Sequence, residues 1–181
     1  MLSLSYGTDM TYLIERISQN PKLPGLFIFI VCLIALGTAF FVEYGLGIDP
    51  CILCLYQRIP YVAAGLFALF AIVSKPGGFT QQAALLGCAI AFMSGASIAF
   101  YHFGVEEQWW AASCSGAQDL NMSLDDLKAS IMAEPLKPCD SKDWVMLGLS
   151  VTVYNTLGSL FLALSSFTSL LIIRKLKEHS R

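Results

Sequence analysis

Four long apolar runs constrain the fold of this chain more than any other feature of its sequence. They cover residues 23–42, 55–74, 82–103 and 151–173. Each is close to the roughly 20 residues with which an α-helix crosses the hydrocarbon core of a bilayer. Small residues recur within the runs, which permits close approach of helices in lipid. The sequence therefore predicts an all-α membrane protein built as a bundle of four transmembrane helices.

The composition agrees with a membrane protein. Only 13% of the residues are charged and 56% are hydrophobic, whereas a soluble domain carries about 25% charged residues. The first run is longer than the core of a secretory signal, so we interpret it as an uncleaved span. The chain has no basic stripe, no Gly-rich phosphate loop and no HExxH motif. Nucleic-acid binding and the common soluble-enzyme classes are therefore not indicated.

The remaining sequence forms two ends and one large loop. We expect an N-terminal segment at 1–22, a transmembrane domain at 23–173 and a C-terminal tail at 174–181. The polar loop 104–150 contains a stretch at 123–131 whose apolar stripe predicts a short helix lying on the membrane surface. Tryptophans flank this loop at positions typical of the interface: Trp109, Trp110 and Trp144.

The basic residues predict the orientation. Most of them lie in 1–22, in the turn at 75–78 and in 174–181, all on one side of a four-span bundle. Few belong to or face the other side: Arg58, Lys128, Lys137 and Lys142. Because Lys and Arg mark cytoplasmic loops, we expect both termini to be cytoplasmic and the loop 104–150 to lie outside.

The two cysteines nearest to each other in the sequence, Cys51 and Cys54, lie directly before the second apolar run. Two cysteines separated by two residues can close a small, reactive disulfide, and one thiol of such a pair often has a lowered pKa. The same spacing also suits half of a zinc site. The position of the pair and its neighbours must therefore decide its chemistry.

The six cysteines divide by location. Cys32 and Cys88 lie inside apolar runs, and we interpret them as small hydrophobic residues. The other four lie on the outer side, where an oxidising compartment lets disulfides form and persist: Cys51, Cys54, Cys114 and Cys139.

Two pairings of these four are natural, Cys51 with Cys54 and Cys114 with Cys139. The second pairing would be a structural disulfide that closes a long loop and contributes about 2–4 kcal/mol to the stability of the fold. A bridge across two residues constrains almost nothing, so the first pair is better explained as redox-active. A four-cysteine zinc site is the alternative, although only one half has the close spacing. No His follows Cys54, which excludes covalent haem attachment.

Arg58 and His102 are the other candidate site residues. Arg58 is a charge one turn into an apolar run, and at the centre of such a helix it would cost about 2.5–3.5 kcal/mol. It can snorkel to the head groups. It also follows Cys54 by four residues, on the same helical face, where a cation stabilises a thiolate or an anionic acceptor. His102, near the outer end of the third run, can reach the same level or can simply be solvated.

The stretch from Pro50 to Arg58, read as Pro-Cys-Ile-Leu-Cys-Leu-Tyr-Gln-Arg at the start of the second of four spans, resembles the bacterial disulfide bond formation protein B (DsbB) family. The second cysteine pair follows in a later outer loop, which is the order of this family and the reverse of that in vitamin K epoxide reductase relatives. The resemblance covers about residues 24–173.

The stretch entering the fourth span also resembles the family. It contains Pro138-Cys139-Asp140, then Asp143-Trp144 and Leu147-Gly148-Leu149-Ser150. The chain departs from the family directly afterwards. Where a proline often follows, this sequence has Val151, Thr152, Val153, Tyr154 and Asn155.

The resemblance implies a quinone-dependent protein thiol-disulfide oxidoreductase of the bacterial inner membrane, with its redox cysteines in the periplasm. Such an enzyme reoxidises a periplasmic thioredoxin-fold dithiol protein (DsbA-like) and passes the electrons to ubiquinone or menaquinone. By this resemblance, Cys114 receives the partner's thiolate, Cys139 then reaches Cys51, and Cys54 delivers electrons to the quinone. Arg58 and, by approximate position, His102 would help to bind the quinone.

Two other classes of function stay open on the residues alone. The outer cysteines could form stabilising bridges in a structural membrane protein, or they could hold a metal ion. The reactivity of the cysteines separates the three hypotheses. A redox-active pair exchanges with dithiothreitol and with quinone, whereas a structural disulfide resists reduction. A zinc site contains no disulfide.

Overall fold

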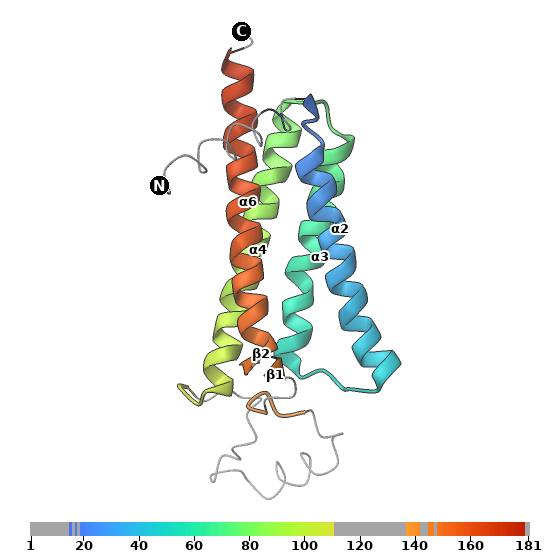
Figure 1. Ribbon diagram of the computed structural model, residues 1–181, viewed down its shortest axis with the longest axis vertical. Coiled ribbons are helices and arrows are strands. Elements are labelled where there is room, and N and C mark those ends of the chain that lie inside the picture. The colour runs from blue at the N-terminus through green and yellow to red at the C-terminus, as the bar shows by residue number, and fades with distance from the viewer. Residues whose placement is uncertain are drawn as a thin grey trace, which may run out of the picture.

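Four long helices make up the computed structural model, which describes residues 15, 17, 19–110, 137–141, 145–146 and 148–179. The helices are α2 (Leu23–Phe40), α3 (Ile52–Val73), α4 (Phe79–Glu106) and α6 (Val151–His179). A π-helix, η1 (Phe41–Gly45), continues α2, and two short antiparallel strands, β1 (Val145–Met146) and β2 (Leu149–Ser150), precede α6. Figure 1 shows the helices side by side along the long axis of the molecule.

All four helices, α2 together with η1, are long and apolar enough to cross a membrane. Large apolar side chains cover their outer surfaces, as expected of faces that meet lipid: among them Leu33, Ile34, Phe41, Ile59, Phe70, Ile90 and Phe161. The predicted all-α, four-helix membrane fold is confirmed. Helix α3 begins at Ile52, ahead of the predicted run, and α4 continues to Glu106, so Cys54 and His102 both lie on helices.

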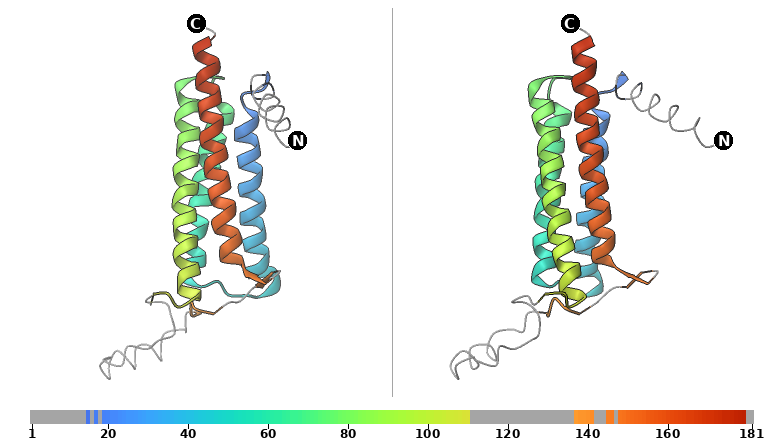
Figure 2. Two further views of the ribbon diagram at one scale, coloured as in Figure 1. Left: turned by 60° about the vertical axis from the view of Figure 1, so that its left-hand side comes forward. Right: turned by 90° about the vertical axis from the view of Figure 1, so that its left-hand side faces the viewer.

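The helices alternate in direction, which gives the bundle two distinct ends (Figures 1 and 2). The start of α2, the turn at 75–78 and the end of α6 lie at one end, which we call the inner end. The start of α3, the end of α4 and the β1–β2 hairpin lie together at the other end, which we call the outer end. The CxxC pair and the Cys139 segment, far apart in sequence, thereby reach the same end of the fold.

Helix α4 is central to the packing, because it contacts both α3 and α6 along their lengths, while α2 packs mainly on α3. Close approach depends on small residues. A Cβ added at Gly95 of α4 would lie 3.2 Å from the Cβ of Pro60 in α3. The core cluster consists mostly of small and aliphatic side chains: Ile17, Ile28, Cys32, Ala64, Ala68, Ala71, Ala84, Leu85, Cys88, Ala91, Phe92, Leu162, Ala163, Leu170 and Ile173.

The chain folds back on itself at the outer end of α4. The Trp110 indole donates a hydrogen bond to the Tyr101 carbonyl at 3.1 Å and stacks on the Tyr101 ring, with centroids 5.7 Å apart. Trp109 donates from its backbone to the Gly104 carbonyl at 2.8 Å. A side chain at position 104 would clash with the Trp110 ring, which explains the glycine there. The predicted helix at 123–131, and Trp144, lie outside the described residues.

Candidate functional site

The CxxC pair forms the N-terminus of α3. Cys51 is the N-cap residue, with an extended backbone, and its Sγ accepts a hydrogen bond from the Cys54 backbone N–H at 3.3 Å. The two sulfur atoms lie 3.0 Å apart and share a hydrogen bond, and both residues are free thiols. Cys51 is only 2% exposed, whereas Cys54 is half-buried. The buried sulfur therefore faces the protein, and the more accessible one faces the edge of the bundle.

The surroundings of Cys51 favour its thiolate. The hydrogen bond from the Cys54 side chain lowers the pKa of the Cys51 thiol, and burial opposes this effect. Contact with His102 and the hydrogen bond from the Cys54 backbone lower the pKa further. The positive end of the α3 dipole acts in the same direction. The net effect is a pKa of the Cys51 thiol well below that of an ordinary cysteine.

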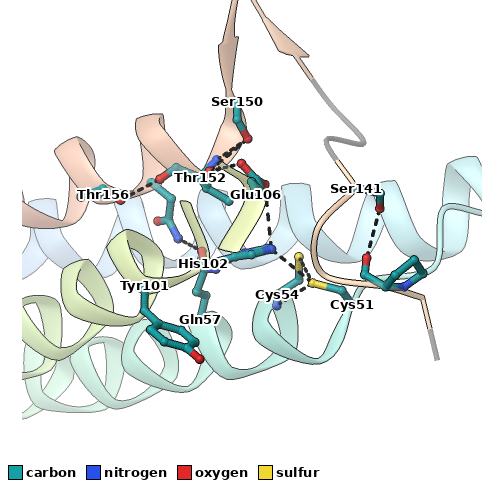
Figure 3. A network of polar contacts seen from close by, with 12 residues as sticks. Cys51, Cys54, Gln57, Tyr101, His102, Glu106, Ser141, Ser150, Thr152 and Thr156 are labelled. Atoms are coloured by element: carbon teal, nitrogen blue, oxygen red, sulfur yellow. Dashed lines mark hydrogen bonds and ion pairs between the residues drawn. The ribbon is translucent and has the colours of Figure 1, made fainter. Parts of the chain in front are cut away.

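His102 lies beside Cys51 in a buried polar cluster, shown in Figure 3. Its side chain is 3% exposed, and its Nε2 lies 3.6 Å from the Cys51 Sγ. On the other side of the ring, the Gln57 amide Nε2 contacts Nδ1 at 2.8 Å. One carboxylate oxygen of Glu106 lies 3.9 Å from Nε2, and the other accepts a hydrogen bond from Thr152 at 2.7 Å. His102 is thus enclosed by the protein and not solvated.

Cys139 lies in the same buried cluster as Cys51, together with Leu53 and Val105. It is disulfide-bonded and 1% exposed, and its backbone contacts His102. Cys114, the predicted partner in that disulfide, lies outside the described residues. The structure therefore places one cysteine of a disulfide in the same cluster as the CxxC pair. Thiol-disulfide exchange between the two pairs would require such proximity.

Arg58 lies between α3 and the end of α2. It forms an ion pair with Glu43 of η1, and its guanidinium carbon lies 5.1 Å from the centre of the Phe40 ring. Both charged side chains are largely buried. A buried cation inside a span needs such a partner, so simple snorkelling does not describe Arg58. Its position in the first turns of α3, four residues after Cys54, is as predicted.

Several polar residues of the site went unnoticed as candidates. Gln57 and Glu106 contact His102 directly, and Glu43 pairs with Arg58. Asn155 of α6 donates a hydrogen bond to the Gln57 side-chain oxygen. The available signal was that each interrupts or borders an apolar run, where polar residues are costly and commonly functional. Asn155 stands in the stretch where the sequence departs from the family pattern.

The cluster also has the shape of a metal site. One ligand atom each from Cys51, Cys54 and His102 lies within 4.8 Å of the others, the one such group in the part of the chain that the structure describes. However, an amide nitrogen can only donate, so the Gln57 contact makes Nδ1 of His102 the acceptor and leaves the ring proton on Nε2, facing the sulfurs. With Cys139 in a disulfide, only the two thiols remain as ligands, which argues against a zinc site.

Comparisons with known proteins show similarity to one described family. The family model described as "Disulfide bond formation protein DsbB" matches residues 21–169. The chain is 32% identical over 148 residues to "Disulfide bond formation protein B" of Methylococcus capsulatus, covering 78% of this chain and 88% of that protein. It is 26% identical over 150 residues to "Disulfide bond formation protein B 2" of Pseudomonas syringae pv. syringae, covering 75% and 79% of the two chains.

Proposed function

The chain belongs to the DsbB family of disulfide bond formation proteins, and we propose that it reoxidises a periplasmic DsbA-like dithiol protein and transfers the electrons to a membrane quinone. Family membership places it among membrane proteins of disulfide bond formation, with a thiol oxidoreductase role. The observation that carries the finer proposal is the burial of Cys139 and Cys51 in one cluster at the outer end of the bundle.

The first half of the reaction is oxidation of the partner by the Cys114–Cys139 disulfide. A partner thiolate attacks Cys114, and Cys139 leaves as a thiolate. The partner's second thiolate then attacks the mixed disulfide, so the partner departs oxidised and Cys114 is released as a thiol. Two electrons have moved from the partner's dithiol to the loop pair. Low-pKa thiolates and accessible sulfurs are what such exchange requires.

The second half passes these electrons to the CxxC pair. Cys139 attacks Cys51 of the Cys51–Cys54 disulfide, and Cys54 leaves. Cys114 then attacks Cys139, which restores the loop disulfide and frees Cys51. The products are a disulfide at Cys139 and free thiols at Cys51 and Cys54. Cys139 is disulfide-bonded and Cys51 and Cys54 are free thiols in the structure, and the burial of Cys139 and Cys51 in one cluster supports the order of exchange.

The surroundings of Cys54 fit a lipid-soluble acceptor. Cys54 is the more accessible thiol of the pair, and it stands at the edge of a helix bundle covered with apolar side chains. Arg58, one turn further along α3, offers a cation, and Phe40 at the end of α2 offers an aromatic ring beside it. When bound there, a quinone supplies the acceptor for the two electrons and two protons of the dithiol. Cys54 and Arg58 would hold it, with His102 acting from the Cys51 side.

The proposal includes an orientation. The outer end of the bundle would face the periplasm and both termini the cytoplasm, following the distribution of Lys and Arg. A membrane-impermeant thiol reagent applied to reduced cells should then label only cysteines of the outer group: Cys51, Cys54, Cys114 and Cys139. Labelling of none of the four would contradict this orientation.

The direct test is turnover by the purified protein in lipid nanodiscs. A reduced thioredoxin-fold protein with a CxxC pair serves as the donor, and water-soluble ubiquinone and menaquinone analogues serve in turn as acceptors. We expect one quinol for each partner disulfide formed, measured by quinone absorbance and by free-thiol assay. If the outer cysteines resisted dithiothreitol and both substrates stayed unchanged, the protein would be a structural membrane protein instead.

A further inference from the structure

A chain of side-chain hydrogen bonds runs from the middle of the bundle to the CxxC pair. The Tyr61 hydroxyl donates to the Asn155 side-chain oxygen at 2.7 Å. The Asn155 amide donates to the Gln57 side-chain oxygen. The Gln57 amide donates to Nδ1 of His102 at 2.8 Å. Helices α3, α4 and α6 all contribute, and every donor in the chain points toward Cys51.

This directionality decides which nitrogen of His102 carries the proton. An amide nitrogen has no lone pair to offer, so Nδ1 must accept from Gln57. A neutral imidazole that accepts at Nδ1 carries its hydrogen on Nε2. Nε2 is the nitrogen that lies 3.6 Å from the Cys51 sulfur. The imidazole therefore offers Cys51 a donor and not a lone pair.

We propose that Asn155 and Gln57 are positioning residues that lock His102 in the Nε2–H tautomer, so that it donates a hydrogen bond to the Cys51 thiolate. Asn155 occupies the Gln57 oxygen and thereby turns the Gln57 nitrogen toward the imidazole. If the Gln57 amide were reversed, its oxygen would accept from Nδ1, and the Nε2 lone pair would face the sulfur. The inference rests on the proposed redox role of Cys51, because it concerns how that sulfur is held as a thiolate.

The other groups around His102 do not exclude Cys51 as an acceptor from Nε2. The Glu106 oxygen at 3.9 Å is beyond hydrogen-bond distance, and the second oxygen of that carboxylate is engaged by Thr152 of α6. From α3, Cys54 faces Cys51 and lowers its pKa directly. The Cys139 segment contributes a disulfide, which does not titrate, and a backbone hydrogen bond to His102, which is compatible with a ring proton on Nε2.

The test uses the reduced protein without quinone or partner. In Asn155→Leu, the Gln57 amide loses the donor that orients it, although residue 155 does not touch His102. We expect the ring ¹⁵N spectrum of His102 to change from the Nε2–H tautomer to a mixture. The ionisation constant of Cys51 should fall by roughly threefold to tenfold, because one hydrogen bond to the thiolate is weakened. Thiolate absorbance, taken as the difference from Cys51→Ala, measures this.

Two further variants separate the proposal from a general loss of structure. Ser159→Ala removes a hydroxyl that contacts Asn155 and Tyr61 but not Gln57, and it should leave both readouts unchanged. Gln57→Glu places an oxygen against Nδ1 and should move the proton of the neutral ring to that nitrogen. An Nδ1–H tautomer in the unsubstituted protein, or an Asn155→Leu variant with unchanged spectrum and titration, would overturn the proposal. Failure of quinone turnover alone would overturn the proposed function and leave this tautomer assignment standing.

Discussion

Cys51, at the outer end, and Cys88, in the core of the bundle, show how the surroundings of a buried cysteine set its expected chemistry. Both are buried, at 2% and 0% exposure. Cys88 lies among small apolar residues of the core cluster, and its thiol contacts the Ala64 carbonyl at 3.5 Å. Cys51 caps a helix and faces a second thiol and an imidazole. Burial alone therefore does not predict whether a cysteine is inert, because the groups that face the sulfur decide it.

The largest expected contrast comes from removing each of these two sulfurs. Cys51→Ala should reduce quinone turnover to the uncatalysed background, because no disulfide can form with Cys54. Cys88→Ala should keep turnover, because that thiol is a packing group. Quinone reduction in nanodiscs with the reduced partner measures both. Equal losses of turnover in the two variants would show that Cys51 has no role beyond that of a buried core cysteine.

The next contrast lies within the outer end, between the loop pair and the CxxC pair. Cys114→Ala should lose turnover with the dithiol protein but retain quinone reduction driven by dithiothreitol, because Cys51 and Cys54 are intact. In Cys139→Ala the loop disulfide cannot form, and Cys114 is a lone thiol. When the partner is supplied in its disulfide form, the Cys114 thiolate should attack it and release one partner thiolate, giving an adduct on Cys114 that no loop thiol can resolve, visible on non-reducing gels. If Cys114→Ala also abolished the dithiothreitol reaction, a relay through two separate pairs would be wrong.

A smaller effect is expected at Arg58, within the first turns of α3. Arg58→Lys keeps the charge but loses the planar guanidinium fork, so the KM for quinone should rise several-fold. The KM for the protein partner should barely change, since that partner reacts at Cys114. Steady-state kinetics with each substrate varied in turn measures both.

Glu43→Gln provides the matched comparison for Arg58, because it removes the charge of the ion-pair partner and keeps an oxygen that can accept from the guanidinium. We expect a weaker effect on the KM for quinone than in Arg58→Lys. Equal changes for the two substrates, or none for either, would exclude Arg58 from the quinone site.

The smallest effect concerns the inner end alone. A Cβ at Gly25 would lie 3.2 Å from the Ala68 carbonyl oxygen and from the Ala71 Cβ of α3. Gly25→Ala should therefore lower the free energy of unfolding by about 1 kcal/mol, through overpacking. Turnover should be unchanged. At Gly37 of the same helix the added methyl would meet nothing within 4 Å, so Gly37→Ala serves as the control. Denaturation in mixed micelles compares the two.

The sequence alone determined the fold class, and it marked the outer end as the candidate site. Apolar runs of bilayer length admit only helices or closed barrels in lipid, so four such runs sufficed to predict the four-helix bundle. The spacing of Cys51 and Cys54 at the start of a run singled out the pair as a candidate site, but it suited a reactive disulfide and half of a zinc site alike. The family resemblance, stated on those residues, is confirmed by the comparisons.

Only the tertiary structure decided which groups face one another. His102 and Cys51 are separated by most of α3 and α4 in the chain, yet the antiparallel packing of these helices brings their side chains together. Asn155 reaches Gln57 from a third helix, and Glu43 reaches Arg58 through a π-helical turn. A local sequence pattern gives the spacing of residues along one helix. These contacts depend instead on how each helix is rotated about its axis relative to its neighbours. That rotation is set by packing of small residues throughout the bundle, which no single stretch of sequence contains.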